Sequence, residues 1–377
     1  MTLEQTLITL RVHLTNISGA GATQLVQSLL PALEQSSAVE ITQVYMPDRG
    51  ALAGYQTQGH ALTYGRRLPN SLSRLLECTI LAGQFDGDEP LLVLGDIPLR
   101  CKAPQTVLVH TPNLLKPTTR IWSMGALKYA ISRWLFRLNA EYARAYIVQT
   151  PWMRDALASS CPGIVDRIHV IAQPVPAWLL AANLDKRTRR TSQSPKLNVI
   201  YPSAWYPHKN HKLLGDITAD QAKDWPVDSF QLTIPQDKNP APSVNWIKCT
   251  GFLAPGEMIQ AYQCTDAMVF LSTDESYGFP LIEAMFVGLP IICPDLPYAR
   301  VLCGEGAIYF DPHSVHSLHR AILTLEAQLA KGWWPDWGRQ LENIPKDWSQ
   351  VASEMTAVAC KLFSSHHPEA ALYSHKA

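Results

Sequence analysis

The chain has 377 residues, nearly half of them apolar, which is enough for two domains with buried cores. Its 32 basic and 32 acidic residues give a formal net charge of zero, which argues against a general nucleic-acid-binding protein. The eight cysteines are scattered without CxxC spacing, so we expect reduced thiols rather than disulfides or a zinc site.

The N-terminal residues favour a cytoplasmic location. Residues 1–14 lack the basic region and apolar block of a signal peptide. No apolar run reaches the roughly 20 residues that cross a bilayer. We therefore expect a cytoplasmic protein, whose membrane contact, if any, is peripheral on the cytoplasmic face of the inner membrane.

Short apolar runs alternate with helical patterns in the first half of the chain. Helical periodicity predicts helices at 22–35 and 127–144. The candidate strands are 8–14, 39–46, 91–96, 106–110, 145–150 and 168–172. Near-continuous apolar strands between helices indicate a buried parallel sheet, so 1–178 is predicted to be a Rossmann-like domain.

A polar, basic stretch, "AANLDKRTRRTSQSPKL" at 181–197, interrupts this alternation and predicts an exposed linker within 179–197. Strands are then expected at 197–204, 230–234, 245–251, 267–272, 290–295 and 307–310. They predict a second Rossmann-like domain at 198–346. A helix at 347–364 and a disordered tail at 365–377 complete the expected organisation.

The stretch "STDESYGFPLIEAMFVGLPIICPD" at 272–295 places two glutamates, Glu275 and Glu283, around a Gly-Phe-Pro turn. The residues after the strand predict a helix that begins at Pro280 and carries Leu281, Ile282 and Glu283 in its first turn. Free N–H groups and the positive end of the helix dipole can hold a phosphate there. The residues alone leave a second interpretation open, in which Glu283 only complements the helix dipole.

The same stretch resembles the signature of family 4 retaining glycosyltransferases, with the E-x7-E pair at Glu275 and Glu283. Further likeness extends over "VIYPSAWYPHKNHKLL" (199–214), "IKCTGFLAPGEMIQAYQCTDAMVFLS" (247–272), "LCGEGAIYFDP" (302–312) and "VLVHTPNLL" (107–115). The resemblance implies the GT-B architecture, two Rossmann-like doubly wound domains facing a cleft. It implies that 1–178 lies on the acceptor side and that 198–346 binds the nucleotide sugar. It also implies that the helix at 347–364 crosses back toward the N-terminal domain.

The resemblance assigns roles to individual residues. Lys209 would bind the diphosphate, Glu275 would lie near the sugar and the reacting carbon, and His110 would orient the donor sugar. Glu283 would accept hydrogen bonds from the ribose hydroxyls, for which two carboxylate oxygens suit a vicinal diol. Further donor contacts are expected at Gly251, Gly278, Phe279, Leu281 and Ile282. No metal and no other cofactor is expected.

Lys209, His110 and a pair of glycines each have a structural alternative to a role in substrate binding. Lys209 could be a solvated loop lysine, and His110 could be a hydrogen-bonded structural residue. Gly19 and Gly21, in "NISGAGATQL", would let the backbone approach a diphosphate or the acceptor, or they could form a plain strand–helix turn. One departure from the family pattern is the absence of an arginine a few residues before the lysine. Either the charge at the phosphate is lower, or His208, Lys212 or another residue takes the place of the arginine.

The segment 116–154 is rich in basic residues, and Trp122, Trp134 and Phe136 lie between them. One interpretation is a helix on an anionic membrane surface, which would suit a lipid-linked acceptor. The other, slightly favoured, is a helix that packs its Trp and Leu side chains inward and leaves its basic groups in water.

The predicted activity is transfer of a sugar from a nucleoside-diphosphate sugar to a glycan or a lipid-linked saccharide. The stretches "YPHKNHKLL" and "DLPYAR" look most like bacterial polysaccharide or O-antigen transferases, often mannosyltransferases, which makes GDP-mannose the expected donor. Two alternatives are a nucleotide-sugar epimerase of the same fold and a non-catalytic scaffold derived from a transferase.

Overall fold

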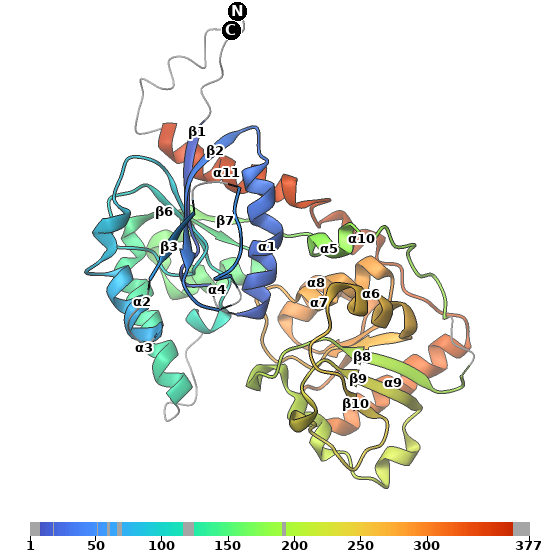
Figure 1. Cartoon of the computed structure of the whole chain (residues 1–377). Coiled ribbons are helices and arrows are strands. Elements are labelled where there is room, and N and C mark those ends of the chain that lie inside the picture. Colours follow the sequence, from blue (N-terminus) through green and yellow to red (C-terminus); the bar gives the residue numbers. More distant parts are fainter. Residues whose placement is uncertain are drawn as a thin grey trace, which may run out of the picture. The chain divides into compact units, whose positions relative to one another are not determined.

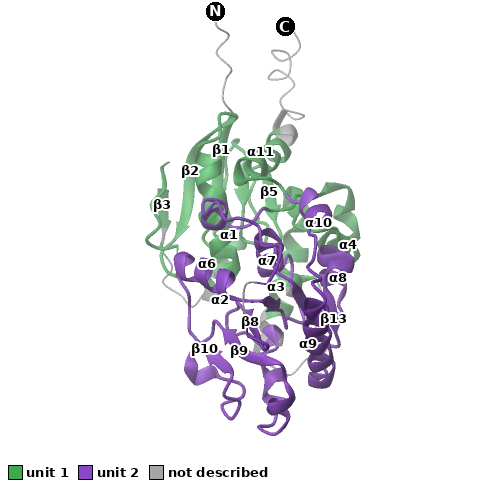
Figure 2. Cartoon of the chain, turned by 90° about the vertical axis from the view of Figure 1, so that its right-hand side faces the viewer, with its two compact units in different colours: residues 1–173, 345–377 green, residues 174–344 purple. Residues whose placement is uncertain are grey.

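The computed structural model describes residues 8–364, except 18, 51, 59–60, 66–69, 116–123 and 191–193. The predicted tail at 365–377 and the basic residues Lys116 and Arg120 lie outside the described residues. The chain divides into two compact units, which we describe separately (Figure 2). Unit 1 comprises residues 1–173 and 345–377, and unit 2 comprises residues 174–344.

Unit 1 contains a parallel sheet of seven strands in the order β3-β2-β1-β4-β5-β6-β7 (Figure 1). The strands are β1 (Ile8–His13), β2 (Val39–Pro47), β3 (Ala61–Tyr64), β4 (Leu91–Val93), β5 (Gln105–Leu108), β6 (Ala143–Val148) and β7 (Ile168–Val170). The helices are α1 (Ala20–Glu34), α2 (Asn70–Cys78), α3 (Met124–Asn139), α4 (Pro151–Ser160) and α11 (Trp348–Ser364).

Unit 2 contains a parallel sheet of six strands in the order β10-β9-β8-β11-β12-β13. The strands are β8 (Leu197–Tyr201), β9 (Val227–Leu232), β10 (Ile247–Cys249), β11 (Ala267–Val269), β12 (Ile291–Pro294) and β13 (Ile308–Phe310). The helices are α5 (Ala177–Leu180), α6 (Pro255–Cys264), α7 (Phe279–Val287), α8 (Pro297–Cys303), α9 (Val315–Ala330) and α10 (Gly338–Glu342).

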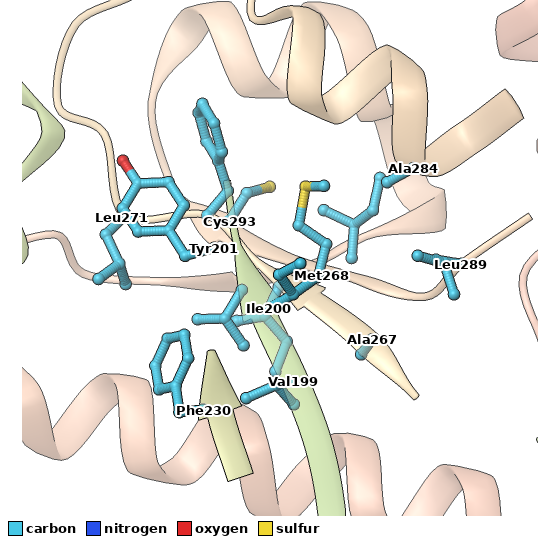
Figure 3. Close-up of a cluster of buried hydrophobic side chains, with 14 of the residues drawn as sticks. Val199, Ile200, Tyr201, Phe230, Ala267, Met268, Leu271, Ala284, Leu289 and Cys293 are labelled. Atoms are coloured by element: carbon cyan, nitrogen blue, oxygen red, sulfur yellow. The ribbon is translucent and has the colours of Figure 1, made fainter. Parts of the chain in front are cut away.

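Both sheets confirm the predicted doubly wound α/β architecture. Every strand predicted from an apolar run is present. Most of these strands are buried on both faces of the sheet, which explains their apolar sequences, whereas β7 is largely exposed. Figure 3 shows the core of unit 2, where Val199 and Ile200 of β8 and Met268 of β11 pack with side chains from the neighbouring elements. The edge strand β3 was not predicted, because its residues 61–63 are exposed and form no apolar run.

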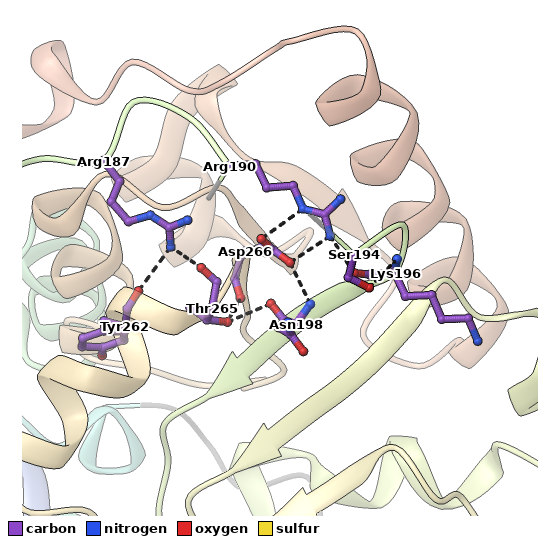
Figure 4. Close-up of polar contacts among 9 residues, drawn as sticks. Arg187, Arg190, Ser194, Lys196, Asn198, Tyr262, Thr265 and Asp266 are labelled. Atoms are coloured by element: carbon purple, nitrogen blue, oxygen red, sulfur yellow. Dashed lines mark hydrogen bonds and ion pairs between the residues drawn. The ribbon is translucent and has the colours of Figure 1, made fainter. Parts of the chain in front are cut away.

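The segment predicted as a linker belongs to unit 2 and is held there by two arginines (Figure 4). Arg187 donates to the carbonyls of Tyr262 and Thr265, which lie at the C-terminal end of α6. Arg190 contacts the buried carboxylate of Asp266, with Nε 3.1 Å from Oδ1. Basic composition suggested solvent exposure, but arginine also binds the carbonyls left unpaired at helix ends.

The last helix, α11, follows unit 2 in the chain but packs against α1 in unit 1. Its buried side chains are Val351, Ala352, Met355 and Ala359. Their spacing of about one helical turn places them on a single face. Burial of this apolar face explains why the chain returns to the first unit.

Candidate functional site

The two units share one topological feature that selects where ligands bind. In each sheet the strand order reverses next to the first strand, between β1 and β4 in unit 1 and between β8 and β11 in unit 2. Ligands of open parallel sheets bind beyond the carboxyl ends of the strands at such a switch point. In unit 2 the loop after β8 carries Lys209 and the loop after β11 carries Glu275.

These two loops are joined through one carbonyl group. The carbonyl oxygen of His208 accepts hydrogen bonds from the Thr273 N–H at 2.7 Å and from the hydroxyls of Ser272 and Thr273. On the other side, the hydroxyl of buried Tyr201, the last residue of β8, donates to the carbonyl of Lys209 at 2.9 Å. The backbone beside Lys209 is therefore held against the loop that carries Glu275.

The side chains of Lys209 and Glu275 form an ion pair, although 66 residues separate them in the chain. Nζ lies 2.5 Å from Oε1, and the side chains are 15% and 12% exposed. An ammonium group has three donors, so the pair leaves others for a phosphate oxygen. This contact places a positive and a negative charge together at the switch point of unit 2.

The helix α7 begins after Gly278, whose φ of 83° is the left-handed conformation that glycine adopts without strain. A Cβ there would lie 3.3 Å from Leu281 Cδ1. The helix starts at Phe279, so Pro280 occupies its second position. The prediction that the helix begins at Pro280 is therefore wrong by one residue. The positive end of the helix dipole lies just beyond the Glu275 loop.

The predicted donor contacts at Leu281 and Ile282 stay predictions, and the structure shows where these two residues lie. The amide N–H groups of Leu281 and Ile282 both point to the carbonyl of Gly278, at 2.9 and 3.5 Å, and their side chains are fully buried. These groups are therefore occupied within the helix. The reason is that the helix starts one residue earlier than predicted, which brings both amides into its hydrogen-bond pattern.

Glu283 lies beyond the first turn of α7, so the alternative of a helix-dipole role is wrong. Its side chain is buried, and Oε2 accepts a 2.5 Å hydrogen bond from the hydroxyl of Tyr262 on α6. Burial and the nearby Glu283 raise the pKa of Tyr262 well above its ordinary value, so its hydroxyl remains a donor. The sequence did not indicate Tyr262, because it lies in another helix on an apolar face.

Gly251 follows β10 in the left-handed conformation, with φ of 75°. Apart from its two chain neighbours, none of the described residues has an atom within 4 Å of the position that its Cβ would occupy. Gly19 precedes α1 and Gly21 lies in its first turn, and the positions of their Cβ atoms are open too. The left-handed backbone of Gly251 favours glycine at that position. At Gly19 and Gly21, close packing against other side chains does not explain why the residue is glycine.

His110 follows β5 in unit 1, where Asp96 holds its backbone. The carboxylate of Asp96 accepts from the amides of His110 and Thr111 at 2.8 and 3.0 Å and from the Thr111 hydroxyl at 2.7 Å. His110 Nδ1 lies 3.5 Å from Asp96 Oδ1, and Arg74 of α2 donates to the Gly95 carbonyl. Sequence reasoning missed Asp96, although a carboxylate directly after an apolar strand was a usable signal.

Asp96→Ala should lower the free energy of unfolding of unit 1 by about 3 kcal/mol, because it leaves two partly buried amides and a hydroxyl without their acceptor. Asp96→Asn should cost less, since asparagine keeps one acceptor oxygen and tolerates the φ of 67° found here. Denaturant titration of both variants checks this. Equal loss in the two variants would contradict the role given to the carboxylate oxygens.

His208 was a candidate to replace the positive charge of the missing arginine, and it does not supply that charge near pH 7. Burial and the positive Lys209 lower the pKa of His208, and they lower that of His211 to about 4. Both rings are therefore neutral near pH 7. His211 Nε2 lies 2.8 Å from the Ser203 hydroxyl, and Trp205 stacks on its ring. Lys212 is exposed and remains a candidate for the second positive charge.

His211 should make stability depend on pH. Its folded-state pKa of about 4 lies below the ordinary value of 6.5, so between these values the unfolded chain binds more protons. The contribution is complete above pH 6.5, falls as the pH drops, and is lost below pH 4, a change of about 3 kcal/mol. Denaturation of wild type and His211→Gln across this range measures it, and equal slopes would contradict the prediction.

Two further properties of the described residues concern membranes and metal ions. None of their helices is both long and apolar enough to cross a membrane. No group of three or more His, Cys, Asp or Glu side chains in the described part of the chain is arranged to hold a metal ion.

Comparison with known proteins agrees with this fold. Residues 244–330 match the family model described as glycosyl transferases group 1. The chain is 37% identical over 65 residues to the O-antigen chain mannosyltransferase RfbU of Salmonella typhimurium, covering 17% of this chain and 18% of that protein. It is 27% identical over 78 residues to the O-antigen chain mannosyltransferase B of Escherichia coli, covering 21% and 20%. These matches span about a fifth of the relatives' length.

Solved structures share the fold over nearly the whole chain. Sucrose-phosphate synthase from Thermosynechococcus elongatus aligns with a TM-score of 0.59 at 14% identity, covering 97% of this chain and all of that one. WaaG, a glycosyltransferase involved in lipopolysaccharide biosynthesis, aligns with a TM-score of 0.59 at 9% identity, covering 94% and 98%. The predicted fold of the GT-B glycosyltransferases is confirmed, whereas the cleft between the domains stays a prediction.

The family match covers β10 to α9 and so contains Glu275, Glu283 and the turn between them, but neither Lys209 nor His110. The resemblance expected from the E-x7-E turn is confirmed. Residues 244–330, which carry this turn, match the family model of the glycosyl transferases group 1.

Proposed function

We propose that the protein is a glycosyltransferase that moves a sugar from a nucleoside-diphosphate sugar to a glycan or lipid-linked saccharide during synthesis of a cell-surface polysaccharide. The observation that carries the proposal is the Lys209–Glu275 pair, which lies where the loops after β8 and β11 meet, just before α7. A lysine and a helix N-terminus together suit an anionic leaving group.

The chemistry explains why this arrangement is useful. Transfer breaks the bond between the anomeric carbon and a diphosphate, so negative charge grows on the leaving phosphate and the carbon becomes cation-like. Positive charge fixed beforehand at the phosphate lowers the barrier, and Lys209 is held for that role by the backbone contacts of its loop. Glu275 would then stabilise the cation-like carbon or bind the sugar hydroxyls.

We propose retention of anomeric configuration, with departure and attack on the same face of the sugar. The leaving phosphate would take the acceptor's proton, so Glu275 needs no role as a covalent nucleophile. Glu283 would bind the ribose hydroxyls through carboxylate oxygens oriented by the Tyr262 hydrogen bond. His110 would orient the donor sugar from unit 1, and Asp96 would act as its positioning residue.

GDP-mannose is the proposed donor, because the matched relatives are O-antigen mannosyltransferases by name. The test starts with thermal stabilisation by a panel of nucleoside-diphosphate sugars. A donor at one hundred times its dissociation constant should stabilise the fold by about 2.7 kcal/mol. The stabilising donor is then incubated with glycan acceptors in EDTA, and product formation and anomeric configuration are followed by NMR.

Each outcome decides between the functions considered. Donor cleavage that needs an acceptor supports transfer, and an unchanged rate in EDTA supports a reaction without metal. Interconversion of nucleotide sugars without an acceptor would instead identify an epimerase. Binding without turnover in wild type, with biological activity unaffected by Lys209→Ala and Glu275→Ala, would identify a scaffold.

A further inference from the structure

The outward face of α3 in unit 1 is apolar. Ile131, Trp134 and Leu138 are 46%, 58% and 42% exposed, whereas Leu135 and Phe136 are buried in the core. The three exposed residues are spaced by three and four positions, so they form one stripe along the helix. The favoured prediction, that Trp and Leu side chains of this segment pack inward, is therefore wrong for Trp134 and Leu138.

This stripe continues into neighbouring elements. Tyr142 follows α3 and is exposed, and the guanidinium of Arg100 lies over its ring at 5.9 Å. The Arg100 amide in turn donates to the carbonyl of Cys78, the last residue of α2. Asn139, at the end of α3, donates to the same carbonyl at 2.8 Å. The end of α3 and the turn after α2 are thus fastened together.

That turn adds two more exposed apolar side chains, Ile80 and Leu81, which are 79% and 47% exposed. We call the whole surface the α3 ridge, formed by Ile80, Leu81, Ile131, Trp134, Leu138 and Tyr142. A cluster of large apolar side chains of this kind is unusual on a surface that contacts only water, and such clusters mark interaction sites. Scattered single hydrophobic residues would need no such explanation.

Arginines flank the ridge. Arg137 is exposed one turn from Trp134, and Arg133 lies one turn before Arg137. Arg100 is exposed over Tyr142. Glu141, an acidic neighbour, is paired with Arg167 at 3.0 Å. The whole chain carries no net charge, so this positive charge is a local property of the ridge.

We propose that the α3 ridge inserts its apolar side chains into the headgroup region of an anionic lipid bilayer. Apolar and aromatic side chains flanked by arginine are the composition that binds at such an interface, where Trp and Tyr are favoured. A second copy of the chain fits less well, because a two-fold interface would place the arginines of both copies in one interface with no added negative charge. Anionic lipid headgroups complement them instead.

This attachment stands without the proposed function, since it depends on surface chemistry alone. If the protein is also a transferase, attachment would keep it next to a lipid-linked acceptor, and that consequence rests on the proposed function. The test therefore measures lipid binding in the absence of any donor, so that failure of one proposal does not decide the other.

The experiment is co-sedimentation of the full chain with vesicles of phosphatidylcholine, with and without phosphatidylglycerol. We expect binding that requires phosphatidylglycerol and weakens as salt rises from about 0.1 M to about 1 M, over which the Debye length falls from about 10 Å to about 3 Å. Trp134→Ser and Ile80→Ser should each reduce the partition coefficient about tenfold, since each removes a large inserted side chain. Arg137→Glu should have an effect of similar size.

Matched controls come from α9 of unit 2, where Leu323 and Arg320 are exposed. Leu323→Ser and Arg320→Glu should bind vesicles as wild type does, and unchanged thermal unfolding shows that each variant is folded. Wild type that stays in the supernatant, or Trp134→Ser and Ile80→Ser that bind like wild type, overturns the proposal. A dimer in size-exclusion chromatography that Trp134→Ser dissociates, without vesicle binding, would assign the ridge to a second copy and also overturn it.

Discussion

Lys209→Ala should lower kcat/KM for sugar transfer by about two to three orders of magnitude, the usual effect of removing one preorganised group that stabilises developing negative charge. The loss should fall mainly on kcat, because the charge on the leaving phosphate grows in the transition state. Steady-state kinetics with the donor identified by thermal stabilisation measures both parameters.

The control for this variant is Lys223→Ala, which removes another ion pair of unit 2. Lys223 pairs with Asp220 at 2.8 Å, and both side chains are exposed. Its loss should leave kcat/KM unchanged, because exposed pairs contribute little and this one lies away from the strand ends that form the site. Folded Lys209→Ala protein with wild-type kinetics would refute the phosphate-binding role.

Glu283→Gln should raise the dissociation constant of the donor about 10- to 100-fold. The substitution keeps the shape of the side chain but replaces a charged acceptor by a neutral one, and hydrogen bonds to charged groups are worth about 1.5–3 kcal/mol. Titration calorimetry with the nucleoside diphosphate measures the change. Glu342→Gln, at an exposed position of α10, is the matched control.

Tyr262→Phe tests whether the orientation of the Glu283 carboxylate, and not only its presence, contributes to donor binding. It removes the 2.5 Å hydrogen bond to Glu283 Oε2 but keeps the aromatic ring in the core. We expect weaker donor binding than in wild type but stronger than in Glu283→Gln, since the carboxylate remains and only its orientation is lost. If Glu283→Gln binds the donor as wild type does, Glu283 has a structural role beside Tyr262 and no contact with the ribose.

The two parallel sheets could be predicted because their signals are local. Runs of apolar residues mark strands that are covered on both faces, and Gly278 marks the turn into α7 by its left-handed conformation. The placement of Lys209 and Glu275 after separate strands was predictable for the same reason. The exposed strand β3 carried no such signal.

The site itself depends on contacts between distant residues. Burial of Glu283 against Tyr262 joins two helices, and the position of Arg187 joins the predicted linker to the end of α6. Composition does not distinguish an arginine in water from one bonded to carbonyls, nor a Trp in a core from Trp134 on a surface. These outcomes are set by which elements pack together.

The sequence by itself determined the class of fold, the ends of the strands that carry functional residues, and the likeness of the E-x7-E turn to a transferase signature. Each of these three features depends on short, continuous stretches of sequence. Only the tertiary structure decided that β8 and β11 are neighbours, and hence that Lys209 meets Glu275. The physical reason is that strand order depends on how the apolar faces of distant segments pack together. No single stretch of sequence specifies which segment lies next to it.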